Sequence, residues 1–227
     1  ATSTTDTHTI SVTQSGSGDI TVTGLTNGTS YTFTVTATNA IGTSVASVAS
    51  NSVTPSTAIA IGDFYQGGVV FYIFQSEDTG YVAGETHGLI AAVEDQSSGI
   101  RWYNGSYTTT GATGTAVGTG SANTTTIITE QGATATSYAA GLARAYEGGG
   151  YTDWFLPSKD ELNLMYENIG QGNVLGLGNV GNFAEWYYWS STEHDYNNAW
   201  VQRFLNGIQN VFYKDYASIL VRAVRAF

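Results

Sequence analysis

Carboxylates are the side chains of this sequence that could most readily do chemistry. The candidates fall into an early and a later group: Asp63, Glu77, Asp78, Glu85, Glu94 and Asp95, then Asp153, Asp160, Glu161 and Glu193. A pair of carboxyl groups facing one cleft can cleave a glycosidic bond, and clustered carboxylate oxygens can bind calcium. Asp160 and Glu161 have a structural explanation, because they follow Ser158 in the pattern of a helix start. A carboxylate-dependent glycan-active enzyme, with Glu94 and Glu193 as the residues to test, therefore stays an alternative.

Other catalytic and metal-binding patterns are missing from the sequence. The chain has no cysteine, which excludes thiolate nucleophiles, zinc–thiolate sites and disulfides. Its three histidines, His8, His87 and His194, lie in separate segments, and neither an HExxH nor a GxSxG motif occurs. The GxGxxG match at Gly176–Gly181 follows a predicted helix and precedes a predicted strand, the reverse of a dinucleotide site. We therefore name no catalytic residue, no metal ligand and no cofactor, and a structural calcium on the carboxylates stays an open alternative.

Charge and composition narrow the range of partners. The chain has 227 residues, with 18 acidic against 7 basic side chains and a net charge of −11. Nucleic acids and anionic membrane surfaces both attract basic faces, so we expect no nucleic-acid partner and no membrane insertion within this chain. Only 11% of the residues are charged, while Gly, Thr, Ser and Asn are abundant. That composition is common in turn-rich β proteins that are secreted or displayed on surfaces.

Residues 1–57 are predicted to form a small all-β domain. Short runs of Val, Ile, Thr and Tyr alternate with polar residues between Gly and Asn turns, as strands do. Ile20–Pro55 resembles the C-terminal half of a fibronectin type III domain, with Tyr31 at the tyrosine-corner position. Residues 1–19 lack the strand that carries the core tryptophan of such domains. The module is either truncated or a reduced immunoglobulin-like sandwich, and its expected role is that of a spacer.

Residues 58–227 are predicted to form a second domain, of the α+β class. Apolar runs and alternation predict strands at Gln66–Phe74 and His87–Asp95, and later at residues 187–193, 199–207 and 220–227. The Ala-rich segment Thr134–Glu147 predicts a helix that ends at a run of glycines. A second helix is expected after Ser158, which begins a capping box that Glu161 closes.

Two further expectations concern the interior and the loops of this domain. Residues 104–126 are rich in Gly and Thr and are predicted to form a long loop. Four tryptophans are predicted to build the core, because each can bury a large apolar area: Trp154, Trp186, Trp189 and Trp200.

Five motifs of the second domain resemble a bacterial surface family with a C-type lectin fold, related to formylglycine-generating enzymes. They are IGDFYQGGVVFYIF, GYVAGETHGLIAAVEDQSSGIRW, GGGYTDWFLPSKDELNLMYENI, YYWSSTE and VRAVRAF, and they are distributed along the domain from residue 61 to residue 227. The resemblance implies a C-type lectin fold. The enzymatic branch relies on cysteines, so its activity is not expected in a chain without them.

The last segment resembles the variable proteins of diversity-generating retroelements, in which template adenines are randomised in the copied gene. The family frame YYWSSTE–AW–Q–F–NG–Q–K–VRAVRAF is intact, and the resemblance makes the residues in its gaps, within segment 194–220, variable ligand contacts. They are His194, Asp195, Tyr196, Asn197, Asn198, Val201, Arg203, Leu205, Ile208, Asn210, Val211, Phe212, Tyr213, Asp215, Tyr216, Ser218 and Ile219. A randomised AAC codon cannot give Lys, Gln, Glu, Trp or Met, and none of these five occurs in the set.

The resemblance implies a non-enzymatic ligand-binding protein that displays a hypervariable surface near its C-terminus. Its ligand would be a protein or glycan on another cell, and its setting extracellular, on a cell surface or a virion. We expect Val211–Tyr213 to lie in a loop, since adjacent aromatic residues without alternation suit one. Besides the enzyme, a purely structural surface or fibre module stays an alternative, in which all these residues are framework.

Overall fold

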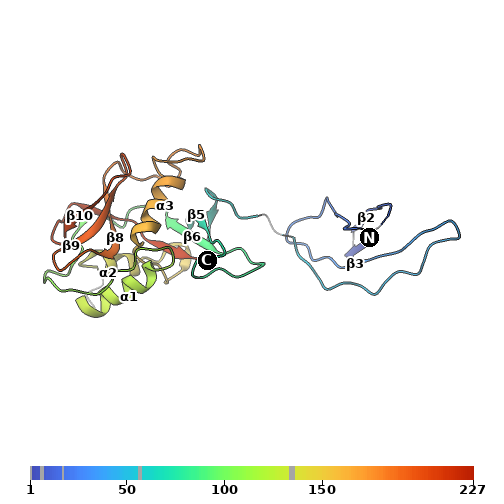
Figure 1. Ribbon diagram of the computed structural model, residues 1–227, viewed down its shortest axis with the longest axis horizontal. Coiled ribbons are helices and arrows are strands. Elements are labelled where there is room, and N and C mark those ends of the chain that lie inside the picture. Colours follow the sequence, from blue (N-terminus) through green and yellow to red (C-terminus); the bar gives the residue numbers. More distant parts are fainter. Residues whose placement is uncertain (1, 6–7, 17, 56–57, 133–135) are drawn as a thin grey trace. The chain divides into compact units, whose positions relative to one another are not determined.

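A computed structural model describes residues 2–5, 8–16, 18–55, 58–132 and 136–227. Contacts within the chain divide it into two compact units, Ala1–Ala58 and Ile59–Phe227 (Figure 1). Among the described residues the first unit has strands and no helix, and the second combines helices with two sheets. In the parts of the chain described here, no helix combines the length and the apolar character needed to cross a membrane.

The first unit is a small β structure organised around Tyr31. Strands β1 (Thr2–Thr5), β2 (His8–Ser11) and β3 (Phe33–Thr34) form an antiparallel sheet in the order β2-β1-β3. The buried Tyr31 accepts a hydrogen bond at its phenol oxygen from the backbone N–H of Thr26, at 3.0 Å. A tyrosine hydroxyl that bonds to the backbone a few residues upstream is the geometry of a tyrosine corner. The assignment of this unit to the immunoglobulin-like class stays a prediction.

A serine repeat holds a long irregular hairpin in the same unit. Ser44, Ser47 and Ser50 donate their backbone N–H groups to the carbonyls of Ala37, Val35 and Phe33 at 2.8–2.9 Å. Their hydroxyls accept the return N–H groups of the same partners, each at 3.0 Å. Bonded positions are therefore three residues apart on the serine arm and two apart on the Phe33–Ala37 arm, and this mismatch interrupts a regular strand ladder. For this reason the alternation in the sequence gives an extended backbone here and not the continuous strands that it predicts.

The second unit contains two sheets. The first has the order β12-β6-β5-β4 and is antiparallel, with β4 at Phe64–Tyr65, β5 at Gly68–Ile73, β6 at Gly88–Ala92 and β12 at Val224–Ala226. The second has the order β10-β9-β8-β11-β7, and β11 runs parallel to β8. Its strands are β7 (Ser97–Ile100), β8 (Tyr187–Glu193), β9 (Asn198–Arg203), β10 (Gln209–Tyr213) and β11 (Ile219–Val221). The predicted strands at 66–74, 87–95, 187–193 and 199–207 are confirmed within a few residues.

The last predicted strand is split between the two sheets. β11 belongs to one sheet and β12 to the other, and Arg222 lies between them with 1% of its surface exposed. The Arg222 guanidinium pairs with Asp95 at 2.7 Å and donates to the carbonyls of Ala92 and Gly181 at 2.9 and 2.6 Å. A side chain this well bonded anchors the crossing point, so the chain changes sheets where the sequence predicts one strand.

Three α-helices pack beside the sheets: α1 (Gly120–Gln131), α2 (Ala139–Arg144) and α3 (Lys159–Ile169). A short 3₁₀ turn, η1, covers Gly148–Gly150. The capping box of α3 is confirmed, because Ser158 and Glu161 bond to each other's backbone N–H groups at 3.3 and 2.7 Å. The loop prediction for residues 104–126 is wrong from residue 120 onwards. The Thr-rich α1 has weak helix propensity, and burial of Asn123, Thr124 and Ile127 stabilises it in place of propensity.

The core of the second unit is rich in tryptophan. Trp102, Trp154 and Trp189 are fully buried, and their indole N–H groups donate to the carbonyls of Ser190, Gly148 and Ile100 at 2.8–3.1 Å. Two of the four predicted core tryptophans are therefore wrong: Trp186 is 45% exposed and Trp200 is half-buried. The sequence prediction also omits Trp102. Altogether the unit is a mixed α+β domain, compatible with a C-type lectin fold.

A candidate ligand-binding surface on the C-terminal strands

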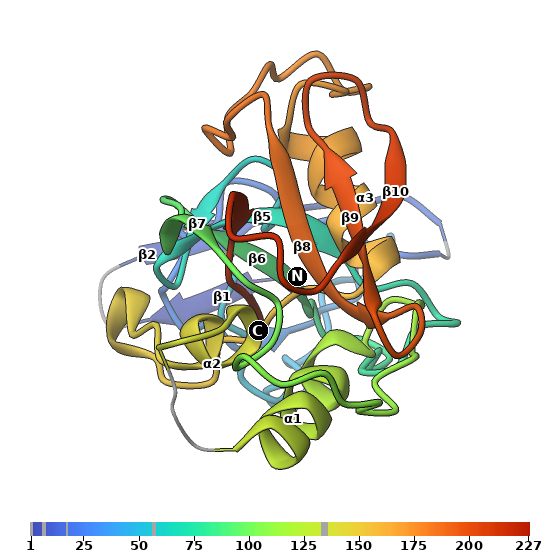
Figure 2. The same ribbon diagram turned by 90° about the vertical axis from the view of Figure 1, so that its left-hand side faces the viewer.

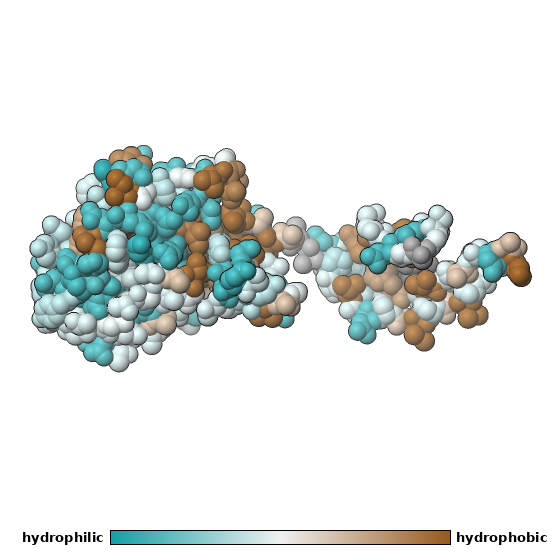
Figure 3. Space-filling model, viewed as in Figure 1, coloured by the Kyte–Doolittle hydropathy of each residue, from teal (hydrophilic) through white to brown (hydrophobic). Residues whose placement is uncertain are grey.

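The predicted variable positions follow the end of β8, the strands β9 and β10 and the turns that join them, with α3 packed behind β8 and β9 (Figure 2). Most of these side chains are exposed: His194, Asp195, Tyr196, Asn197, Leu205, Ile208, Asn210, Tyr213, Asp215, Tyr216 and Ser218. Four are half-buried: Asn198, Arg203, Val211 and Phe212. The space-filling view shows apolar atoms gathered at several places on the otherwise hydrophilic surface of this unit (Figure 3).

Two predicted contacts belong to the core. Val201 is 1% and Ile219 2% exposed, so neither can reach a ligand in this structure. In the sequence Val201, Arg203 and Leu205 alternate with Gln202 and Phe204, which predicts a strand with one face toward the scaffold and the other toward the ligand. In the structure both faces are covered, because Val201 packs into the core and the Gln202 amide donates to Asn163 of α3 at 2.8 Å. Alternation therefore does not separate buried from exposed residues on this strand.

The segment predicted as a loop at Val211–Tyr213 is a strand. β10 pairs antiparallel with β9, with Gln209 opposite Gln202 and Tyr213 opposite Asn198. In the order of its sheet β10 has one neighbour, β9, and its residues are half-buried or exposed on both faces. An edge strand of this kind shows no clean alternation of apolar and polar residues. For that reason the segment Val211–Tyr213 lacks the alternation of a strand, and its sequence predicts a loop.

A buried ion pair connects the segments that carry the exposed positions. The Lys214 ammonium lies 2.6 Å from a carboxylate oxygen of Glu193, and both side chains are almost fully buried. The same ammonium donates to the carbonyls of Thr108 and Tyr196, each at 3.0 Å, and lies 4.9 Å from the centre of the Trp102 ring. All three N–H donors of the lysine thus have acceptors, which a buried charge requires.

The carboxylate of Glu193 completes this network. It accepts hydrogen bonds from the backbone N–H groups of Thr110 and Gly111 at 2.8–2.9 Å. The pair therefore ties the loop after Trp102, the turn after β8 and the end of β10 to one point. Glu193, a candidate acid of the enzyme alternative, is occupied by these structural bonds.

The turn between β8 and β9 is held by its own side chains. Asp195 accepts hydrogen bonds from the backbone N–H groups of Asn197 and Asn198, both at 2.8 Å, and from the Asn198 amide at 2.9 Å. His194 lies 2.9 Å from the other carboxylate oxygen. Donation from the Asn198 side chain, followed by that of His194 and the backbone, holds the pKa of Asp195 well below its usual range. The backbone of this turn is therefore set by local bonds.

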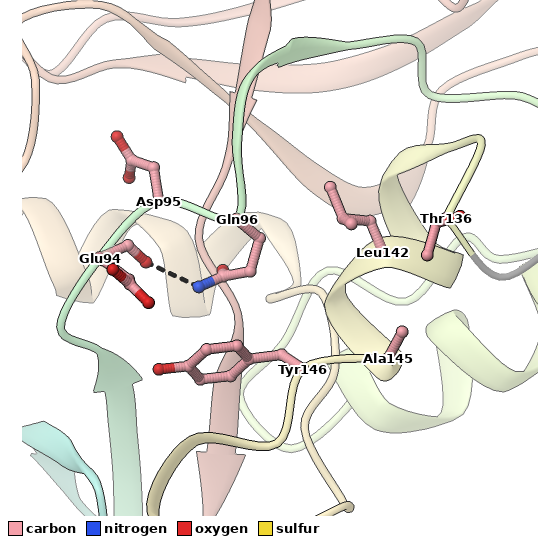
Figure 4. Close-up of a pocket in the computed structure, with 7 residues that line it drawn as sticks. All are labelled: Glu94, Asp95, Gln96, Thr136, Leu142, Ala145 and Tyr146. Carbon is pink, nitrogen blue, oxygen red and sulfur yellow. Dashed lines mark hydrogen bonds between the residues drawn. The ribbon is translucent and has the colours of Figure 1, made fainter.

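The other candidate acid, Glu94, lines a surface hollow of about 350 Å³. Figure 4 shows its lining: Glu94, Asp95, Gln96, Thr136, Leu142, Ala145 and Tyr146. The neighbouring Asp95 is paired with Arg222 at 2.7 Å, and Glu193 is not among the lining residues. The hollow thus does not bring the two candidate acids together. Among the described residues no group of three or more acidic or histidine side chains is placed to hold a metal ion.

Glu161 is a fully buried acid whose pKa is raised. Burial raises the pKa of its carboxyl group to about 7, against the opposing effect of N–H donors from Ser158, Gly118 and Gly120. The N–H groups of Ser158 and Gly118 lie 2.7 and 2.8 Å from its oxygens. The group is fully buried and joins the start of α3 to the loop before α1, so its role in this structure is structural.

A protein-family model described as the Lcl C-terminal domain matches residues 91–225, more than half of the chain. The chain belongs to this family. Lcl is a variable protein of a diversity-generating retroelement with a C-type lectin fold, so the predicted resemblance is confirmed. No curated protein matches the chain. The Lcl C-terminal domain family is one of variable ligand-binding domains, and the matched range of this member includes all the positions discussed above.

Four aromatic residues next to the surface of this Lcl C-terminal domain were not predicted from the sequence. Tyr103 and Tyr107 precede α1, while Trp186 and Tyr187 lie at the start of β8. They fall outside the frame gaps, and the tryptophan had been assigned to the core. The signal for Trp186 and Tyr187 was the density of rings in the run Trp186-Tyr187-Tyr188-Trp189, where more rings follow one another than one strand can bury.

Proposed function

We propose that the second unit binds a ligand, without catalysis, through the exposed and half-buried side chains of the predicted variable set. A retroelement diversifies these side chains, and the backbone that carries them stays fixed. The chain is displayed outside a cell or on a virion, with the first unit as a spacer. This function is supported by the family and by the geometry of the C-terminal strands.

One observation carries the proposal. The frame residues and the gap residues were separated on the sequence alone, and they differ in exposure. Most frame residues are buried, and Glu193, Ala199, Gln202, Phe204 and Lys214 are at most 3% exposed, while Asn206 and Ala226 are the exposed exceptions. The gap residues are exposed or half-buried at every position except two. A stable scaffold with replaceable surface residues requires this division, since substitutions at exposed positions away from special features change stability little.

The test is a library of the full chain randomised at the exposed positions other than His194 and Asp195, whose side chains hold the turn after β8, and selected for binding to a purified protein. Binders should be recovered, and they should unfold at the same temperature as the parent within a few degrees. The matched control library is randomised at exposed residues of the other sheet and its loops, Phe64, Tyr81 and Val82. If both libraries yield binders equally often, or neither does, the site assignment is wrong.

The enzyme alternative makes a separate prediction. Glu94→Gln would abolish a carboxylate-dependent hydrolysis of glycans while leaving unfolding and ligand binding unchanged. On our proposal, neither the parent nor the variant hydrolyses a glycan panel. A structural module without a ligand, the other alternative, would give no binders from the exposed-position library.

A further inference from the structure

Aromatic rings inside and outside the predicted variable set form a continuous run on the surface. The Trp186 ring lies 5.7 Å from Tyr187, and Tyr187 lies 4.7 Å from Phe212. Phe212 is 5.4 Å from Tyr216, which is 6.2 Å from Tyr213. The last three are predicted variable positions and the first two are not. The rings touch in edge-on or tilted arrangements, which are favourable for aromatic pairs.

A second run approaches the same place from the loop after Trp102. The ring of Tyr103 lies 4.8 Å from Tyr107, and Tyr107 lies 5.9 Å from Tyr196. Burial, and then the carboxylate of Asp215 to which the phenol donates a hydrogen bond, raise the pKa of Tyr107, with Tyr213 also acting on it. Tyr107 therefore lies beside the residues that end the first run. The two runs meet around Asp215.

The rings outside the variable set are held in place by the scaffold. The indole N–H of Trp186 donates to the carbonyl of Ser218 at 2.9 Å, while 45% of the residue stays exposed. Tyr187 and Tyr107 are half-buried and pack against the core cluster that contains Trp102 and Trp189. An exposed aromatic side chain that is already fixed loses little conformational entropy when a partner covers it. These side chains have the properties of binding anchors.

We infer that Trp186, Tyr187 and Tyr107 are constant anchors of the binding surface, shared by every variant that the retroelement produces. The partner that fits this member, with its present residues at the variable positions, is a folded protein with an apolar patch edged by basic side chains. This inference rests on the proposed function. It adds to it a part of the site that diversification does not change, and a chemical class of partner.

The chemistry around the anchors favours a protein partner. Leu205 and Ile208 are 43% and 54% exposed at the turn between β9 and β10, and aliphatic groups beside rings match the apolar centre of a protein interface. Asp195 and Asp215 are exposed at the margin, and the chain carries a net charge of −11. An acidic surface of this kind attracts basic partners and repels acidic ones.

The experiment takes several independent binders from the library randomised at the exposed positions and selected on lysozyme, a basic protein. Trp186→Ala is introduced into each binder, and Phe64→Ala, an exposed residue of the other sheet, is the matched control. We expect Trp186→Ala to raise Kd at least about 30-fold in most binders, as loss of an interface hot spot does, and the control to leave it within about 2-fold. Urea unfolding of each variant shows whether the fold is kept.

The possible outcomes separate this inference from the proposed function. If no binders are recovered, the proposed function fails first. If binders are recovered and Trp186→Ala leaves their Kd unchanged, the constant-anchor inference is overturned while the proposed function stands. If Trp186→Ala unfolds the domain, Tyr107→Ala provides the second measurement, with the same expectation. The partner class is tested on the parent chain, which keeps its own residues at the exposed positions: binding to dextran or another glycan on an array, with no binding to basic proteins, would overturn the assignment of a protein partner.

Discussion

Removal of the buried ammonium of Lys214 should destabilise the second unit more than any change at its exposed surface. Lys214→Met keeps a long apolar stem but leaves the Glu193 carboxylate buried without its counter-charge. The carbonyls of Thr108 and Tyr196 also lose their donor. Breaking a buried pair by removing one partner typically costs about 3–5 kcal/mol, because the remaining charge stays buried. We expect a loss of that size in the free energy of unfolding.

The pair should show coupling in a double-mutant cycle. Glu193→Gln keeps acceptor capacity toward the N–H groups of Thr110 and Gly111 but leaves the lysine charge unpaired. In the double variant no charge remains, so its cost should be smaller than the sum of the two single costs by about 2 kcal/mol or more. This difference isolates the interaction from the packing lost at either position.

Urea unfolding followed by tryptophan fluorescence measures these costs. All five tryptophans of the chain lie in the second unit, so the signal reports on that unit alone. The matched control is Lys159→Met at the chain's other lysine, which lies half-buried 4.5 Å from the Trp200 ring. We expect it to cost about 1 kcal/mol or less. Two results would refute the view that this pair holds the loops together. One is a loss of stability for Lys214→Met as small as that of the control, and the other is a double variant whose loss equals the sum of the two single losses.

Three further predictions concern burial, backbone and pH. Val201→Asp should lower the free energy of unfolding by about 4 kcal/mol or more, because it buries an unpaired charge, whereas Tyr213→Asp should change it by at most about 1 kcal/mol. Equal losses for the two variants in urea unfolding would contradict the assignment of Val201 to the core and Tyr213 to the surface. Gly207 and Gly176 have nearly equal φ angles, +73° and +72°, so an alanine strains the backbone equally at both. Only at Gly207 would the added carbon meet an aromatic ring, at 2.4 Å. Gly207→Ala should therefore lower the free energy of unfolding by about 1–3 kcal/mol more than Gly176→Ala. Burial raises the pKa of Glu161 to about 7 from 4.5, so the native state holds a proton that the unfolded state releases. The free energy of unfolding therefore contains a contribution from Glu161 that is fully present below pH 4.5 and is lost as the pH rises through 7, on the order of 3 kcal/mol. Glu161→Gln should remove this fall with pH. A variant whose stability depends on pH as the parent's does would contradict the prediction.

Local signals in the sequence predicted local structure well. The capping box of α3 needs only Ser158 and Glu161, three residues apart, and the structure has both of its hydrogen bonds. The strands of the two sheets were found because runs of apolar residues report burial directly. α1 was missed because its Thr-rich sequence has no strong apolar face, and contacts distant in the sequence keep it helical.

Contacts between residues that are far apart in the chain could not be predicted from the sequence. Lys214 was correctly placed in the framework, but nothing near it in the chain points to Glu193, 21 residues away, or to Thr108, 106 residues away. Glu193 was accordingly kept as a candidate acid, since a lone carboxylate in a sequence does not show whether it is paired. The surface rings of Trp186 and Tyr187 were missed for a related reason. Whether an aromatic residue at the start of a strand is buried depends on which segments cover it.

If a retroelement randomises the predicted variable positions, as we propose, the two buried ones show how the fold limits the diversity that it can use. A randomised AAC codon at residues 201 and 219 gives charged and small residues as well as aliphatic ones. Both side chains lie in the core cluster that contains Trp102 and Trp189, where a void or an unpaired charge costs several kcal/mol. Variants with a charged or small residue at these positions would rarely fold, because a domain has only about 5–15 kcal/mol of stability. The usable repertoire therefore comes from the exposed positions, where Tyr213, Tyr216 and their neighbours can be exchanged without reaching the core.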